Sequence, residues 1–256
     1  MIRKLSIYIL CPLLVLALCS ACTFSPSEKS VPSDEEIPAA VNEAEDQTGQ
    51  AYIDSFVFLG ESTTYHLKSR GVLSGGTKTK QVWGPENGTI NLDTTIATLQ
   101  IIYPETGERL TIGEALARKK PRRILFCFGL NGAVAKHRRG PEYFKACYRL
   151  LLDTVRACSP STEIYLQSAF PVAENMDVST YSVDVDTLNR YIDEINTWTR
   201  ELGLEYGATY LDTAKALKDA AGRLRTEYQI GDGHHLTAEA YRKMLSYIIE
   251  KKGATE

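Results

Sequence analysis

The feature that most limits the fold of this chain is the alternation of short strand-like runs with helical patterns. The strand-like runs occupy residues 55–59, 123–128, 163–169 and 209–212, with a shorter run at 81–83. Because parallel neighbours need long crossover connections, strands that alternate with helices predict a parallel sheet with helices on both faces. In such α/β folds, ligands bind at the carboxyl ends of the strands. Functional side chains are therefore expected just after these runs.

Three helices can be assigned from residue spacing. One begins at Pro141, a residue favoured in the first turn of a helix, and carries apolar residues at helical spacing up to Cys158. A second carries apolar residues from Leu188 to Leu202 at the same spacing, and Gly203 is its expected end. A third follows Thr237 as N-cap. The glycine-rich segment 71–118 gives no firm assignment.

The first 22 residues predict a processing signal. Arg3 and Lys4 precede an apolar stretch, 5–18, that is too short for an ordinary membrane span. Small residues before Cys22 are similar to a bacterial lipoprotein cleavage box, which makes Cys22 the expected lipidated N-terminus and predicts an extracytoplasmic protein anchored to the cell membrane. Cys19 stands where such boxes usually carry leucine, so an ordinary secretory signal or an uncleaved anchor is the alternative.

Residues 23–50 predict a disordered acidic tether, because they contain almost no large apolar residues. As a flexible coil, such a segment reaches roughly 30 Å. Residues 1–50 hold three of the 29 basic and seven of the 32 acidic residues, which leaves 26 and 25 in the globular domain, 51–256. This near-neutral domain gives no indication of a nucleic-acid partner. The basic cluster of Lys136, Arg138 and Arg139 is interpreted as a solvated helix face.

The cysteines indicate neither a disulfide framework nor a zinc site. Cys147 and Cys158 share the first predicted helix but lie about 16 Å apart along its axis, too far for a disulfide. The chain has no Gly-x-Ser-x-Gly elbow and no metal-protease or phosphate-loop motif. Neither a metal nor a cofactor is expected.

Polar motifs after the strands and before the last helix carry the residue types of an esterase site. Ser62 follows the first run, Asn131 follows the 123–128 run, and Asp232 and His235 precede the last helix. They supply a nucleophile, an oxyanion donor, a base-orienting acid and a base. Each also has a structural reading, since Ser62 suits a helix N-cap, Asn131 a turn, and Asp232 a turn dipeptide with the next glycine. Their order and placement favour a single site.

At these motifs the sequence resembles the SGNH (GDSL-type) hydrolase family, over about residues 55–249. Gly60-Glu61-Ser62 matches the first family block, although aspartate usually stands where Glu61 does. Gly129-Leu130-Asn131 matches the third block, Asp232 to His235 matches the fifth, and Gly88 is the best match to the glycine of the second.

The resemblance implies a three-layer α/β/α flavodoxin-like fold and a Ser-His-Asp triad. Ser62 would be the nucleophile, His235 the base, and Asp232 the group that orients it. The oxyanion hole would comprise the Ser62 N–H, the Gly88 N–H and the Asn131 side-chain amide. His234 competes with His235 for the role of base, and the family spacing favours His235. His66, four residues after Ser62, is interpreted as a surface residue that could border the pocket.

The expected function is an extracytoplasmic serine esterase that hydrolyses O-acyl esters, in particular acetyl esters of polysaccharides. Trp83, Tyr65 and Tyr103 could stack on a sugar or could belong to the core or rim. An acyltransferase using the same serine is one alternative. A non-catalytic glycan-binding or cell-envelope assembly protein is another, and Glu61 is the one hint toward it.

Overall fold

The structure is a computed structural model that describes residues 49–253. The predicted signal, Cys22 and all but the last two residues of the predicted tether lie outside the described residues. Helix α1 (Gly49–Asp54) begins two residues before the expected start of the globular domain at residue 51. Within 49–253, no helix combines the length and the apolar character needed to cross a bilayer.

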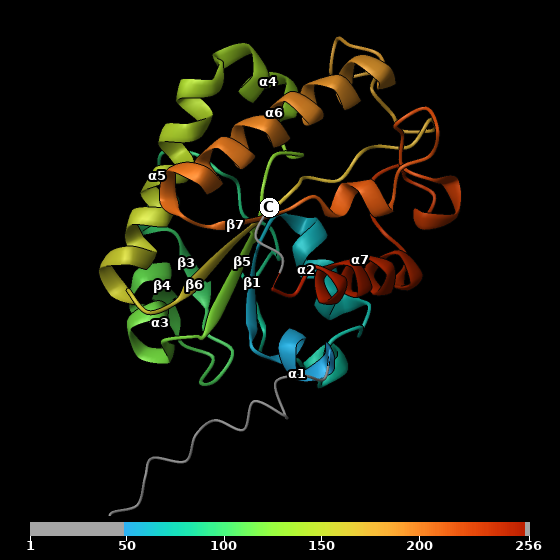
Figure 1. Ribbon diagram of the computed structural model, residues 1–256. Coiled ribbons are helices and arrows are strands. Elements are labelled where there is room, and N and C mark those ends of the chain that lie inside the picture. Colours follow the sequence, from blue (N-terminus) through green and yellow to red (C-terminus); the bar gives the residue numbers. More distant parts are fainter. Residues whose placement is uncertain (1–48, 254–256) are drawn as a thin grey trace, which may run out of the picture. The chain divides into compact units, whose positions relative to one another are not determined.

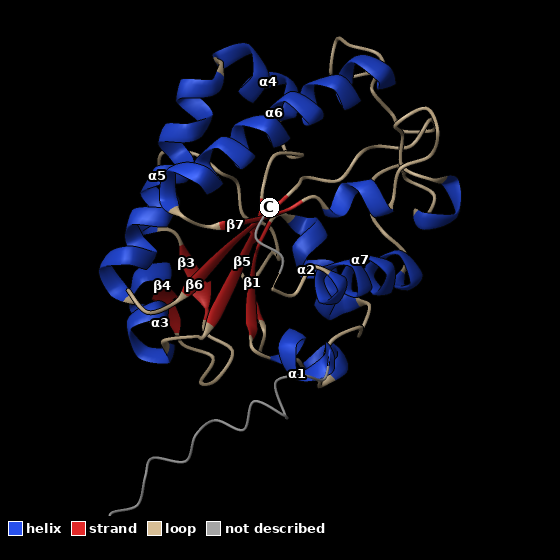
Figure 2. Ribbon diagram, viewed as in Figure 1, coloured by secondary structure: helices blue, strands red, loops and turns tan. Residues whose placement is uncertain are grey.

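A five-stranded sheet forms the middle layer of the fold (Figures 1 and 2). Its strands are β1 (Phe56–Gly60), β2 (Val82–Trp83), β5 (Arg123–Cys127), β6 (Glu163–Gln167) and β7 (Thr209–Leu211). The order is β2-β1-β5-β6-β7, and every neighbouring pair is parallel. The predicted parallel α/β fold is therefore confirmed, with strand limits that differ by one or two residues from those expected.

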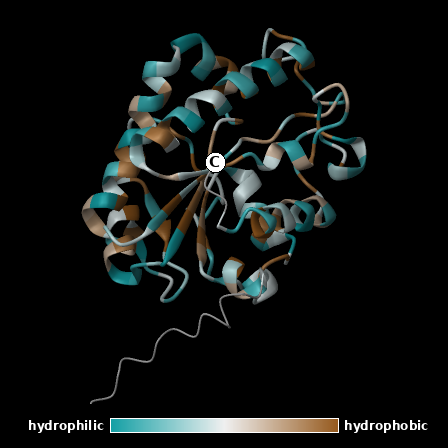
Figure 3. Ribbon diagram, in the orientation of Figure 1, coloured by the Kyte–Doolittle hydropathy of each residue, from teal (hydrophilic) through white to brown (hydrophobic). Residues whose placement is uncertain are grey.

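Helices cover both faces of this sheet (Figure 1). One face packs against α3 (Ile112–Lys119), α4 (Ala133–Arg139), α5 (Pro141–Cys158) and α6 (Val185–Tyr206), and the other packs against α1, α2 (Ser62–Ser69) and α7 (Ala238–Glu250). Val57 and Leu59 join the first apolar core, whereas Phe56 and Phe58 join the second. This alternation follows from the two-residue period of a strand. Figure 3 shows apolar residues concentrated on the central strands.

The unassigned segment 71–118 contains a short antiparallel pair, β3 (Gln100–Ile102) and β4 (Arg109–Thr111). Thr111 then caps α3, because its side chain accepts the Glu114 N–H while the Glu114 carboxylate accepts the Thr111 N–H. Single turns of 3₁₀ helix occupy Gly76–Lys78, Ile96–Thr98, Thr213–Ala216 and Thr226–Tyr228. Strands of three residues carry too little periodicity to be recognised in the sequence.

The predicted end of α6 at Gly203 is wrong. The helix continues to Tyr206 and ends at Gly207, whose φ of 60° is the left-handed conformation typical of a helix C-terminus. Gly203 instead allows a close approach, because a Cβ atom there would lie 3.3 Å from the carbonyl oxygen of Ala208.

Two buried asparagines of α6 hold the irregular segment that follows β6. The Asn196 side chain accepts from the Ala169 N–H at 2.7 Å and donates to the Ala169 carbonyl at 3.1 Å. Asn189 makes the same pair of bonds with Val172, at 2.8 and 2.9 Å. Because buried backbone groups need partners, these amides replace the missing strand neighbour. The Ala173 N–H then donates to the Gly233 carbonyl at 2.7 Å, which connects this segment to the loop of Asp232 and His235.

Candidate active site

The candidate site lies where the direction of strand addition reverses. The chain adds β2 on one side of β1 and then β5 on the other, and ligands of open α/β sheets bind at this kind of switch point. Ser62 begins α2 after β1, and Asn131 follows β5. At the end of β1, Gly60 lets the backbone lie close to the end of β5, because a Cβ atom at that position would lie 2.4 Å from the Cys127 carbonyl oxygen.

The structure brings Ser62, His235 and Asp232 into one hydrogen-bonded chain. The Ser62 Oγ lies 3.0 Å from the His235 Nε2, and the His235 Nδ1 lies 2.7 Å from the Asp232 Oδ2. All three side chains are only partly buried, so the chain of bonds can be reached from solvent. A carboxylate on Nδ1 keeps the proton there and leaves Nε2 free to accept a proton from a hydroxyl. The arrangement can therefore activate a serine nucleophile.

The loop that carries Asp232 and His235 is held by a tight turn. Gly233 has a φ of 81°, and a Cβ atom there would lie 2.5 Å from the Met176 Cα, so only glycine fits. The Gln229 side-chain oxygen accepts the N–H groups of Gly231 and Gly233, at 2.5 and 3.0 Å. The turn therefore fixes the positions of both catalytic candidates.

Asp232 is kept ionised by the same turn. Burial raises the pKa of its carboxyl, but hydrogen bonds outweigh burial and lower the pKa to about 2. These bonds come from the His235 N–H at 2.9 Å, the His235 ring at 2.7 Å and the His234 N–H at 3.1 Å. Asp232 is thus a stable anionic partner for an imidazolium.

Glu61, the residue where the sequence departs from the family block, is fully buried beside Ser62. Its carboxylate accepts three backbone N–H groups at 3.0 Å each, those of Gly129, Leu130 and Asn131. Burial raises the pKa of the Glu61 carboxyl, and the attraction of Lys136 and the three hydrogen bonds oppose that rise. Glu61 therefore connects the loop of Ser62 to the loop of Asn131. This glutamate fills a structural role, and its substitution for aspartate removes no group from the Ser62–His235–Asp232 chain.

Lys136 is a buried cation beside Asn131 that the sequence motifs did not indicate. Its interpretation as part of a solvated face is wrong, because it is 8% exposed. Its ammonium donates to the Asn131 carbonyl oxygen. The Asn131 side-chain amide donates to the Thr89 Oγ1 at 3.1 Å, which leaves its second N–H for another acceptor. In the sequence, the position of Lys136 five residues after Asn131, on the following helix, is the one indication that the two residues lie close together.

Gly88 lies beyond β2, against the ring of Tyr65. Its N–H donates to the Pro85 carbonyl at 2.9 Å, within a turn. The Ser62 N–H, by contrast, opens α2, where the first N–H groups of a helix have no intrahelical partner. Of the three expected oxyanion donors, the Gly88 N–H would have to break its hydrogen bond to the Pro85 carbonyl before it could bind an oxyanion.

Two further histidines flank His235. The ring centroids of His234 and His66 lie 3.9 and 4.5 Å from that of His235. The His234 Nδ1 is 3.2 Å from the Asp232 carbonyl oxygen, whereas the His235 Nε2 is 3.0 Å from the Ser62 Oγ, so the structure places His235 at Ser62. Burial, and then the proximity of His235 and Arg70, lower the pKa of His66 to about 4. Because His66 follows Ser62 by four residues, about one helical turn, it lies on the same face of α2 as Ser62.

Asp232, His234 and His235 are also the one group of potential metal ligands within residues 49–253, with donor atoms within 4.8 Å of one another. Both His235 nitrogens are already directed at Ser62 and Asp232. A metal ion here would compete with the Ser-His-Asp arrangement.

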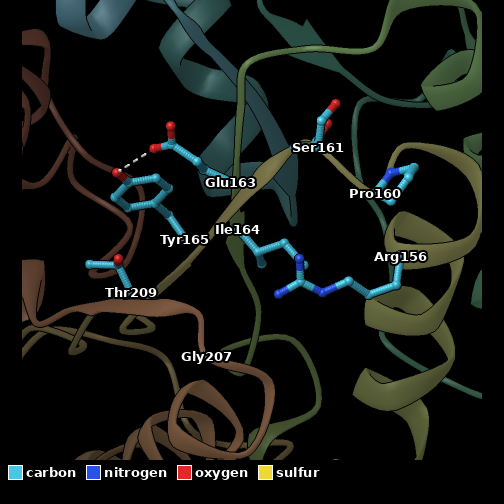
Figure 4. A pocket seen from close by; sticks show the side chains of 9 residues that line it. Arg156, Pro160, Ser161, Glu163, Ile164, Tyr165, Gly207 and Thr209 are labelled. Carbon is cyan, nitrogen blue, oxygen red and sulfur yellow. Dashed lines mark hydrogen bonds between the residues drawn. The ribbon is translucent and has the colours of Figure 1, made fainter.

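The aromatic residues considered for sugar stacking are mostly in the core. Trp83 and Tyr103 are 2% and 3% exposed and pack edge to face, so they cannot offer a surface to a ligand. A separate hollow of about 250 Å³ lies at the amino ends of β6 and β7, around Glu163, Tyr165 and Thr209 (Figure 4). It is at the edge of the sheet opposite to Ser62 and takes no part in the site.

Comparisons with known proteins agree with this geometry. The model of the GDSL-like Lipase/Acylhydrolase family matches residues 58–243, a range that includes Ser62, Asn131, Asp232 and His235. No curated protein matches the sequence.

Several solved structures share the fold at low sequence identity. A candidate platelet activating factor from Streptococcus pneumonia has a TM-score of 0.50 at 20% identity, covering 81% of this chain and 92% of that one. The periplasmic domain of the lipopolysaccharide acetyltransferase of Salmonella ser. Paratyphi A has a TM-score of 0.51 at 15% identity, with 77% and 83% covered. A candidate SGNH hydrolase from Slackia heliotrinireducens has a TM-score of 0.51 at 15% identity, with 77% and 98% covered.

Replacing Glu61 by glutamine should destabilise the protein by about 2–3 kcal/mol, because the amide removes the charge and turns an NH₂ group toward backbone donors. Urea unfolding of Glu61→Gln against the wild type measures this. Glu61→Asp, which keeps the charge, is the control and should lose less stability. Equal stability of the wild type and Glu61→Gln would contradict the role given to this carboxylate.

Asp232 should contribute a pH-dependent part of the stability. Because its pKa in the folded state is lowered from 3.8 to about 2, its contribution is complete above about pH 5 and is lost as the pH falls toward 2. The difference in unfolding free energy between the wild type and Asp232→Asn should therefore shrink over this interval. A difference that stays constant between pH 5 and pH 2 would show that Asp232 is not held as an anion.

Proposed function

Because the chain belongs to the GDSL-like lipase/acylhydrolase family, we propose that it is a serine esterase acting on O-acyl esters through Ser62, His235 and Asp232. The observation that carries the proposal is the pair of short distances from His235, 3.0 Å to the Ser62 Oγ and 2.7 Å to the Asp232 carboxylate. Such a relay is what a serine hydroxyl needs to become a nucleophile near neutral pH.

The first half-reaction acylates the serine. The Ser62 Oγ forms a bond to the acyl carbon while the His235 Nε2 takes the hydroxyl proton, and Asp232 stabilises the imidazolium. The carbonyl oxygen becomes an oxyanion, which the Ser62 N–H and the free N–H of the Asn131 amide can bind. The carbon–oxygen bond to the alcohol then breaks, and the alcohol leaves with the proton from His235.

The second half-reaction returns the enzyme to its starting state. Water gives a proton to His235 and attacks the acyl carbon, and Ser62 leaves with that proton as the free acid is released. If a sugar hydroxyl takes the place of water, the same steps transfer the acyl group. Hydrolysis and transfer thus differ only in the acceptor, and product analysis with an acceptor sugar present separates them.

The substrates proposed for this site are small acyl esters, in particular acetyl groups on carbohydrates, outside the cytoplasm. The N-terminal pattern supports this location, since a basic pair, an apolar stretch and small residues before Cys22 are typical of a lipoprotein signal. A lipid on Cys22 and the acidic segment 23–50 would hold the domain near a membrane without fixing its orientation.

Ser62→Ala should abolish labelling by a fluorophosphonate probe and lower kcat on p-nitrophenyl acetate by at least about 10³-fold, because the nucleophile is removed. Ser69→Ala, an exposed serine on the same helix, is the matched control and should label and turn over normally. Activity that persists in Ser62→Ala would refute the proposed nucleophile. Absence of both labelling and turnover in the wild type would favour a non-catalytic binding protein.

The mature protein should begin with a diacylated Cys22 and fractionate with membranes. Mass spectrometry of the N-terminal peptide measures this directly. Cys22→Ala should release the protein from the membrane, whereas Cys19→Leu should remain lipidated because it restores the residue usual in such boxes. An unmodified mature N-terminus that begins elsewhere would disprove the anchor.

A further inference from the structure

We propose that a hollow of about 320 Å³ beside Asn131 is a subsite for a neutral sugar ring, the alcohol part of the ester that Ser62 cleaves. This inference rests on the proposed esterase function and assigns its substrate class. The hollow is large enough for a small ligand, since ligand pockets begin at about 300 Å³. Asp93, Asn131, Arg139 and Tyr143 are among the residues that line it.

The position of the hollow connects it to the chemistry. Asn131 belongs to both, because it borders the hollow and its backbone N–H donates to Glu61, the neighbour of Ser62. An intact ester that Ser62 attacks, with its carbonyl oxygen at the Asn131 amide, would therefore have its alcohol part within reach of the hollow.

The charges of the hollow favour a neutral ligand. Asp93 uses its Oδ1 to accept from the N–H and the hydroxyl of Thr95, at 2.8 and 2.6 Å, so its Oδ2 is available. The Arg139 guanidinium lies 3.6 Å above the Tyr143 ring, and within residues 49–253 no ion pair joins it to an acid. Lys136, the third charge, is directed at the Asn131 carbonyl and attracted by Glu61. One anion and one cation thus face the ligand without pairing with each other.

Sugar rings match this combination of groups. The Asp93 Oδ2 can accept from a hydroxyl, and the planar Arg139 guanidinium can donate to two neighbouring hydroxyls, while Ala135 and Tyr143 add an apolar surface for the ring C–H groups. A long acyl chain would strip water from Asp93 and Arg139 without giving them partners. An anionic alcohol would be attracted by Arg139 but repelled by Asp93.

Asp93→Asn and Arg139→Gln test the subsite. Each should lower kcat/KM for a mono-O-acetylated methyl glycoside by about tenfold, mainly through KM, because each removes hydrogen bonds to the sugar. Neither should change kcat/KM for p-nitrophenyl acetate, whose alcohol has no hydroxyl to bind. Arg138→Gln is the matched control, since it removes the same charge from the neighbouring position of α4, and it should leave both substrates unaffected.

Other outcomes have distinct meanings. Equal losses on both substrates would overturn the subsite, because the two residues would then support the fold or the chemistry. If Arg139→Gln lowers and Asp93→Asn raises activity, the ligand is an anionic alcohol and the neutral-sugar assignment is wrong. If the wild type turns over neither substrate and Ser62 is not labelled, the esterase proposal itself fails. Ligand-detected NMR of the glycoside with Ser62→Ala then tests the hollow alone, and absence of binding there overturns the subsite.

Discussion

The buried carboxylate of Glu61 is the interaction on which the site depends. An ionised carboxylate inside a protein is costly unless hydrogen bonds and a counter-charge compensate it. Three backbone N–H groups from Gly129 to Asn131 and the nearby Lys136 provide that compensation. Because Glu61 directly precedes Ser62, these hydrogen bonds also hold the end of β1 close to the end of β5. The hydrogen bonds that stabilise the buried carboxylate thus also position the loop of Asn131.

The two carboxylates near Ser62 have separate tasks because their surroundings differ. Glu61 is sealed from solvent and bonded to backbone N–H groups, so it organises the loops. Asp232 is partly exposed, and its hydrogen bonds lower its pKa to about 2, so it remains an anion that can stabilise a charged imidazole. Proton transfer at His235 therefore does not alter the charge that holds Asn131. The protonation state of His235 can therefore change during a reaction while the hydrogen bonds that hold the loops of the site stay in place.

Local patterns predicted much of this structure, and long-range packing decided the rest. The strands and the placement of Ser62 and Asn131 after them follow from runs of apolar residues, a signal contained in a few neighbouring positions. Tyr103 joins Trp83 in the core only because β3 and β4 bring it to the edge strand, and both strands are too short to recognise. The sequence pattern predicts the end of α6 at Gly203 rather than Gly207, because a glycine needed for close packing resembles one that ends a helix. The burial of Lys136 depends on Glu61, 75 positions earlier.

Helix α4 connects the proposed chemistry to the proposed specificity. Lys136 and Arg139 lie three residues apart on α4, about one turn, but their side chains contact different parts of the protein. Lys136 points inward and holds the Asn131 carbonyl, whereas Arg139 lies over Tyr143 at the hollow. With its N–H on Glu61, its carbonyl on Lys136 and one amide hydrogen on Thr89, Asn131 has little freedom to rotate. Its remaining amide hydrogen therefore has a fixed position before a substrate arrives, and the ester of a sugar held by Arg139 would present its carbonyl oxygen to a donor that is already in place.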